Sequence, residues 1–149
     1  MPETATAALR AARDVVIREH MDSENRLDFD ATIATFDHPR YELVATGQVF
    51  DGEDAVRGYF AASRAAFPDQ RNEIVALHHA DDVVVVELDL VGTHLGELAG
   101  AAPTGRRFRC RMAAVFEFAG DRIVCERVYF DTSTILRQIG LVGDDAGTS

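Results

Sequence analysis

The chain has 149 residues, of which 47% are hydrophobic and 27% charged, as is typical of one soluble globular domain with a substantial core. Its formal net charge of −10 argues against binding to nucleic acids or anionic membrane surfaces, because such surfaces attract Lys and Arg. The sequence lacks a membrane-spanning apolar run and the apolar core of a signal peptide, and its two cysteines do not pair in register. These features predict a cytoplasmic protein with reduced thiols and no membrane partner.

The first half of the chain predicts three helices. Residues 4 to 21 have the pattern of an amphipathic helix, and His20 belongs to its apolar stripe. Asp28 has the side chain of an N-cap for a second, short helix. Acidic residues directly after Gly52 predict the start of a third helix, which Pro68 ends.

Six segments have the alternation or the β-branched and aromatic content of strands. The two short ones are Tyr41–Thr46 and Gln48–Phe50, and the four long ones are Arg71–His79, Val83–Gly92, Arg106–Phe118 and Arg122–Phe130. A terminal helix is expected to follow the last strand, because Ile135, Leu136 and Ile139 fall on one helical face before Gly140.

The last two strands predict a hairpin whose register is set by a two-residue turn at Gly120 and Asp121. That register brings an apolar row and a polar row onto one face, as the polar floor of an apolar pocket. The apolar row includes Phe108, Met112 and Phe116, and the polar row consists of Arg127, Tyr129 and Asp131. A shift of one residue would turn the whole polar row to the opposite face.

The order of elements predicts an α+β domain in which a strongly curved antiparallel sheet wraps around helices as a cone with an internal pocket. We expect one domain over residues 1–149, with an ordered core at about 4–141 and a flexible tail at 142–149.

Three segments carry a resemblance to a known family: GTHLGELAGAAPTGRRFR, FEFAGDRIVCERVYFD and ILRQIGL. They resemble the SnoaL-like polyketide cyclases (ester cyclases) of the nuclear-transport-factor-two-like superfamily, a fold also called cystatin-like. The resemblance implies that Asp131 is the acid/base residue and that His94 is the histidine of the G-T-H stretch. The chain departs from many relatives in having Glu126-Arg127-Val128-Tyr129 where they have His-Trp before the Asp. Because the superfamily also includes isomerases, dehydratases, hydrolases and non-catalytic modules, the substrate does not follow from it.

Two readings stand for each of the expected catalytic residues, Asp131 and His94. A buried Asp131 would have a raised pKa and would move a proton at a carbon next to a carbonyl, whereas DTST is also a good N-cap sequence for the terminal helix. His94 would polarise a carbonyl, or it is a loop histidine that hydrogen-bonds to the backbone.

The expected substrate-binding residues are Tyr129, Arg127, Met112, Phe108, Phe116 and His20. Each polar member has a structural alternative: an ion pair for Arg127, core packing for Tyr129 and a satisfied core position for His20. The adjacent His78 and His79 point to opposite faces of a strand, and no other grouping has metal-ligand spacing, so we expect no metal and no cofactor.

We therefore expect a homodimeric, cofactor-free acid/base enzyme that acts on a small carbonyl or polyketide-like compound, as an aldol cyclase or an isomerase. The alternative is a non-catalytic protein that binds a small hydrophobic ligand, and a pure dimerisation module would instead have a filled cone. The dimer is expected to form through the charged outer face of the sheet, which carries Glu87, Asp89, Arg107, Arg109 and Arg111.

Overall fold

The computed structural model of the protein describes residues 4–143, which form helices and strands in the predicted order. The helices in this range are α1 (Ala7–Asn25), α2 (Phe29–Ile33), α3 (Glu53–Ala66) and α4 (Thr132–Gln138). The strands are β1 (Arg40–Leu43), β2 (Gln48–Asp51), β3 (Arg71–His79), β4 (Val83–Thr93), β5 (Arg107–Ala119) and β6 (Arg122–Tyr129). The tail that the sequence predicts to be flexible lies almost entirely outside the described residues.

The helices begin where the sequence supplies capping groups. The hydroxyl of Thr6 accepts the N–H of Leu9 at the start of α1, and the carboxylate of Asp28 accepts the N–H of Ala31 at the start of α2, as predicted. Helix α3 starts after Gly52, whose φ of 92° is one that side-chain-bearing residues rarely adopt. None of the helices within residues 4–143 is long and apolar enough to cross a bilayer.

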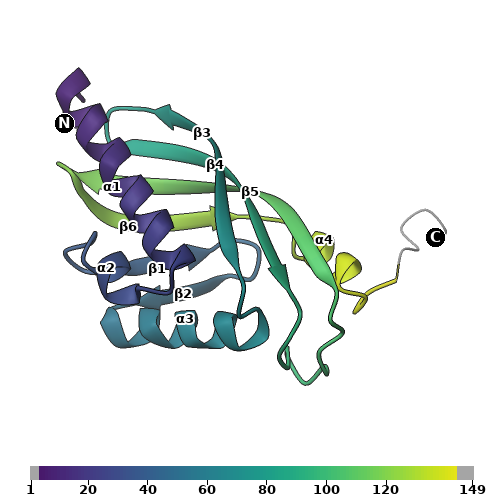
Figure 1. The fold of residues 1–149 in the computed structure, drawn as a ribbon. Helices are drawn as coiled ribbons and strands as arrows, with labels where there is room; N and C mark the ends of the chain where they lie inside the picture. Colours follow the sequence, from purple (N-terminus) through teal and green to yellow (C-terminus); the bar gives the residue numbers. More distant parts are fainter. Residues whose placement is uncertain (1–3, 144–149) are drawn as a thin grey trace.

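The strands form one curved, unclosed sheet in the order β2-β1-β6-β5-β4-β3 (Figure 1). Neighbouring strands are antiparallel, as predicted for the long strands, except that β1 and β6 run parallel. Figure 1 also shows α1 lying across the long strands, with α2 and α3 on the side of the short strands. The α+β fold with a curved sheet is therefore confirmed.

The hydrophobic core fills the space between the helices and the inner face of the sheet. Ile17 of α1, Phe60 of α3 and Phe116 of β5 are at most 1% exposed. Every second residue of β5 from Phe108 to Phe118 is buried, which confirms the apolar face predicted for this strand. The burial of the aromatic and aliphatic side chains of this face stabilises the packing of the sheet against the helices.

The predicted register of the β5–β6 hairpin is wrong beyond its first pairs. The turn is as expected, with Ala119 opposite Arg122 and Phe118 opposite Ile123, but Glu117 then lies opposite Cys125. Val124 is therefore an extra residue without a partner, a β-bulge, and it shifts all later pairs by one position.

The bulge exchanges the two faces of β6. Glu126 and Val128 are buried on the inner face, at 4% and 6% exposed, whereas Tyr129 is 44% exposed on the outer face. Arg127 also faces outward, where its guanidinium contacts Glu117 at 2.7 Å and Glu42 at 3.4 Å. The expected pocket positions of Arg127 and Tyr129 are thus corrected, and Arg127 has the structural ion pairs of its alternative reading.

Candidate functional site

An apolar groove of about 640 Å³ opens between α3, α4 and the inner face of the sheet. Helix α3 lines it with residues spaced three and four apart, among them Ala55, Gly58, Tyr59 and Ala62. The described residues that line the groove include none with a charged side chain. The groove therefore suits an uncharged, largely apolar ligand.

The inner end of the groove continues into a smaller cavity of about 40 Å³, called the end pocket below. Both cavities are lined by Tyr59, Gln70, Leu90, Met112 and Val128. The end pocket differs in having charged walls, because Glu24 of α1 and Glu126 of β6 line it. A ligand in the groove would thus present one end to two buried carboxyl groups.

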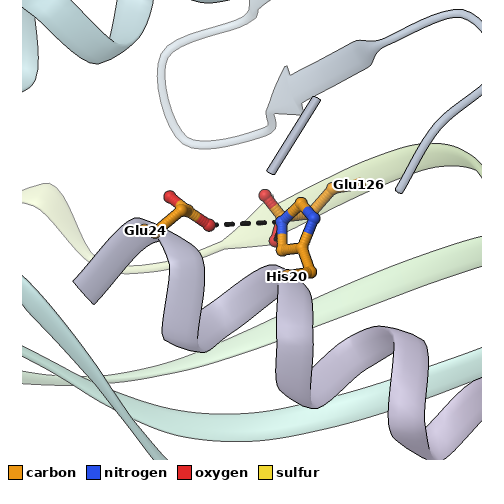
Figure 2. A group of neighbouring side chains, drawn as sticks. All are labelled: His20, Glu24 and Glu126. Carbon is orange, nitrogen blue, oxygen red and sulfur yellow. Dashed lines mark ion pairs between the residues drawn. The ribbon is translucent and has the colours of Figure 1, made fainter. Parts of the chain in front are cut away.

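The carboxyl groups of Glu24 and Glu126 both lie close to the same nitrogen of the His20 imidazole (Figure 2). The Nε2 atom of His20 lies 3.2 Å from Glu24 Oε2 and 3.3 Å from Glu126 Oε1. The hydroxyl of Tyr41 is 3.1 Å from the same nitrogen. His20 is fully buried, so these groups interact without competing water.

The other ring nitrogen of His20 carries a hydrogen. Its Nδ1 lies 3.0 Å from the hydroxyl of Thr35, and that hydroxyl donates its own hydrogen to the carbonyl of Thr32 at 2.6 Å. The Thr35 oxygen is therefore left to accept from Nδ1–H. This contact fixes the ring so that Nε2 faces the two carboxyl groups.

Burial and charge oppose each other in this cluster. Burial alone would lower the pKa of His20, but Glu126 and Glu24 outweigh it and raise the pKa to about 9, so the ring is an imidazolium at neutral pH. Burial raises the pKa of Glu126, and the charge of Glu24 adds to this rise, while His20 opposes it incompletely. Burial also disfavours the charged form of Glu24, but contacts with His20 and Arg64 outweigh it and lower the pKa.

Arg64 of α3 makes the two glutamates unequal. Its Nη2 lies 3.3 Å from Glu24 Oε1, and both side chains are 8% exposed. Glu24 therefore contacts one cation through each oxygen, whereas Glu126 contacts a cation only through Oε1 among the described residues. Glu126 is the carboxyl group better placed to exchange a proton with a ligand.

The same three residues have the spacing of a metal site, which the sequence did not lead us to expect. His20, Glu24 and Glu126 bring one ligand atom each to within 4.8 Å of the others. A metal would have to displace the proton on Nε2, and Arg64 already occupies the other oxygen of Glu24. The donor set fits a proton-sharing network better than a metal-binding one.

Asp131 lies outside both cavities. It is exposed and caps α4, where its carboxylate accepts the N–H of Ser133 and the hydroxyl hydrogen of Thr134, both at 3.0 Å. This is the capping arrangement that the sequence offered as the alternative. The expected position of Asp131 on the floor of the pocket is therefore corrected, for the same reason as those of Arg127 and Tyr129.

His94 is fully buried in the loop after β4 and does not line the groove or the end pocket. Its Nδ1 accepts the N–H of Thr104 at 3.1 Å, and its ring packs near that of Phe67 with 6.0 Å between centroids. The structure thus places His94 as the backbone-bonded loop histidine of the alternative reading.

The remaining predicted site residues divide between the cavities and the core. Met112 lines both cavities, as expected. Phe116 packs edge-on against His20, with 5.2 Å between ring centroids, so it belongs to the core that surrounds the cluster. Phe108 packs on Phe67 at 4.9 Å and does not line the groove.

Sequence reasoning missed Glu24, Glu126 and Arg64. A signal for Glu24 exists, because it follows His20 by four positions, and residues four apart share a helix face. Arg64 falls on the buried face of α3, between Phe60 and Phe67. Glu126 has no such signal, because its inward position depends on the bulge at Val124.

Comparisons with known proteins identify relatives of the chain. The model of the SnoaL-like polyketide cyclase family matches residues 13–139. The aklanonic acid methyl ester cyclase AcmA of Streptomyces galilaeus is 30% identical over 111 residues, which are 72% of this chain and 77% of that protein.

Solved structures share the fold at lower sequence identity. A SnoaL-like protein of Jannaschia sp. CCS1 superimposes with a TM-score of 0.79 at 18% identity, covering 89% of this chain and 94% of its own. IdmH of Streptomyces antibioticus gives a TM-score of 0.75 at 24% identity, covering 86% and 98%. These likenesses concern the fold alone.

Proposed function

Because the chain belongs to the SnoaL-like polyketide cyclase family, we propose that it is a cofactor-free acid/base enzyme of the cyclase or isomerase type. Its substrate is a small, largely apolar compound with a carbonyl group. The observation that carries this proposal is the buried cluster of His20, Glu24 and Glu126 at the inner end of an uncharged groove.

Glu126 is the proposed acid/base residue, in place of Asp131. Its carboxylate takes a proton from the carbon next to the substrate carbonyl, which forms an enolate. The enolate carbon attacks a second carbonyl in a cyclisation, or is protonated elsewhere in an isomerisation, and Glu126 returns the proton. The raised pKa of its carboxyl group supports this role, because a base with greater proton affinity abstracts a proton from carbon more readily.

His20, Glu24 and Arg64 are the proposed support of Glu126. The imidazolium of His20 lies 3.3 Å from Glu126 and holds its carboxyl group in place. Glu24 and Arg64 balance the charge around that imidazolium, with Glu24 between the two cations. Such a network limits reorganisation when the charge of Glu126 changes.

The composition favours direct acid/base chemistry over a covalent route. All 15 basic residues of the chain are arginines, so no lysine side chain is present to form a Schiff base with a carbonyl. Enolisation therefore depends on proton transfer by a group such as a carboxyl, and the end pocket has two carboxyl groups at its wall, with the His20 imidazole in contact with them.

A test of this proposal needs only a simple ketone. We expect the protein to accelerate deuterium exchange at the carbons next to the carbonyl of 2-tetralone in D₂O, measured by proton NMR against buffer. Glu126→Gln should lower the enzymatic exchange rate by about 10²–10⁴-fold. Exchange by the Glu126→Gln variant at the wild-type rate would contradict the assignment.

A non-catalytic binding protein is the second candidate function. It is favoured by the position of Asp131, which caps a helix and leaves the cavities without the aspartate that the family resemblance implies. A protein of this kind would bind 2-tetralone in the groove without accelerating exchange, so the same experiment separates the two functions.

A further inference from the structure

Asn72 of β3 presents an unused hydrogen-bond donor at the wall of the end pocket. Its side chain is buried, at 9% exposed, and lines that pocket together with Glu24 and Glu126. The amide nitrogen Nδ2 has no hydrogen-bond partner among the residues that the structure describes. A buried donor without a partner is costly to folding, so its retention calls for an explanation.

The backbone of Asn72 is held in a fixed position. Its N–H donates to Oδ1 of Asn25 at 2.6 Å, and Nδ2 of Asn25 donates to its carbonyl oxygen at 2.9 Å. This reciprocal pair joins the last residue of α1 to the start of β3. The same helix carries His20 and Glu24, so the amide of Asn72 and the charged cluster are positioned by one element.

The polar groups in and around the end pocket differ in whether their hydrogen-bond donors already have partners. Behind the wall of this pocket, Nε2 of His20 and Nη2 of Arg64 face the carboxyl groups of the cluster, so the charges of these two side chains are already matched. Asn72 Nδ2 is a buried donor without a partner among the described residues, and an acceptor on a ligand that enters the end pocket would satisfy it. A neutral carbonyl oxygen is such an acceptor, whereas a free carboxylate there would be repelled by Glu24 and Glu126.

We propose that Asn72 binds the carbonyl oxygen of the substrate in the end pocket and that the substrate enters as a neutral ketone or ester. This role rests on the proposed function of Glu126. When Glu126 takes the proton from the neighbouring carbon, the C–H electron pair forms the C=C bond and the carbonyl π electrons move to oxygen. Nδ2–H then donates to the enolate oxygen, and this hydrogen bond strengthens as charge develops.

The proposal is tested by infrared spectroscopy of 2-tetralone labelled with carbon-13 at its carbonyl. In the wild-type protein the carbonyl band of the bound ketone should lie at lower wavenumber than in Asn72→Leu, which keeps the side-chain size and lacks the donor. Loss of one such hydrogen bond should weaken binding of the ketone about three- to tenfold. Tetralin, which has the same rings without oxygen, should bind both proteins equally.

The outcomes separate this inference from the proposed function. An unchanged band and unchanged ketone affinity in Asn72→Leu, or an equal loss of tetralin binding, would overturn the role of Asn72 even if exchange is catalysed. A shifted band without catalysed exchange would support Asn72 as a ligand donor and overturn the enzymatic proposal. Thermal unfolding checks that Asn72→Leu is folded, and Asn72→Ala repeats the comparison without added bulk.

Discussion

Nε2 of His20 lies 3.3 Å from Oε1 of Glu126, which joins the first helix of the chain to its last strand inside the core. Both side chains are buried, at 0% and 4% exposed. The pair places an imidazolium against a carboxyl group where water does not screen their charges. The stability of the fold and the proposed chemistry therefore both depend on the protonation states of His20 and Glu126.

The first prediction concerns stability against pH. The pKa of His20 is raised from its ordinary value of 6.5 to about 9 in the folded protein. The folded state therefore binds this proton more tightly, so the stabilisation is complete below pH 6.5 and is lost as pH rises through 9. The free energy of unfolding should fall on the order of 3 kcal/mol over this window, measured by urea denaturation.

Two variants serve as controls for that titration. His20→Gln should abolish most of the decrease between pH 6.5 and 9. His78→Gln should retain it, because His78 is on the surface with a side chain 59% exposed. A wild-type protein whose stability is flat across the window would contradict a buried imidazolium at position 20.

The second prediction concerns Asp131. Because its carboxylate caps α4, Asp131→Ala should destabilise the protein by about 0.5–2 kcal/mol. Asp131→Asn keeps an acceptor oxygen and should cost less. Neither variant should change the deuterium exchange of 2-tetralone, whereas a large loss of exchange in Asp131→Asn would return the acid/base role to this residue.

The third prediction compares two arginines of α3. Arg64→Met leaves the buried carboxylate of Glu24 without one of its cations and should cost about 3–5 kcal/mol in chemical denaturation. Arg57 pairs with Asp30 and Glu53 at the surface, so Arg57→Met should cost about 0–1 kcal/mol. Equal losses in the two variants would mean that the Arg64–Glu24 pair is no more important than a surface pair.

The fourth prediction uses Gly58, which lies within α3 and lines the groove. A Cβ at this position would meet no atom within 4 Å, so a side chain can begin here without a clash and extend toward the groove. Gly58→Leu should keep or raise stability by about 0.5–1 kcal/mol, because glycine is a poor helix residue.

The same side chain should fill part of the groove and weaken 2-tetralone binding, which titration calorimetry would measure. Gly58→Ala is the matched control, because it gains helix propensity while adding only one carbon. Unimpaired ketone binding by Gly58→Leu would indicate that the ligand does not occupy the groove.

The helices and strands were predictable because their patterns are local. Alternation in β5 and the caps at Asp28 and Gly52 depend on neighbouring residues, and the structure has them where the sequence indicates. The site was less predictable, because it is assembled from α1, α3 and β6. His20 was expected to bind substrate, but it lies outside the linings of both cavities. Its partner Glu126 was not expected, since a glutamate on a buried strand face contradicts the usual preference for apolar residues there.

The bulge at Val124 decides which of two sets of β6 side chains forms the floor of the cavity. With the bulge, Glu126 and Val128 face the cavity and the floor is acidic. Without it, Cys125, Arg127 and Tyr129 would turn inward and the floor would be cationic and phenolic. A single-residue insertion or deletion in this hairpin would therefore invert the electrostatic character of the cavity. It would do so by turning different side chains inward, without any substitution at these positions. Comparisons of catalytic residues among such proteins accordingly need an alignment that follows strand register and not residue number alone.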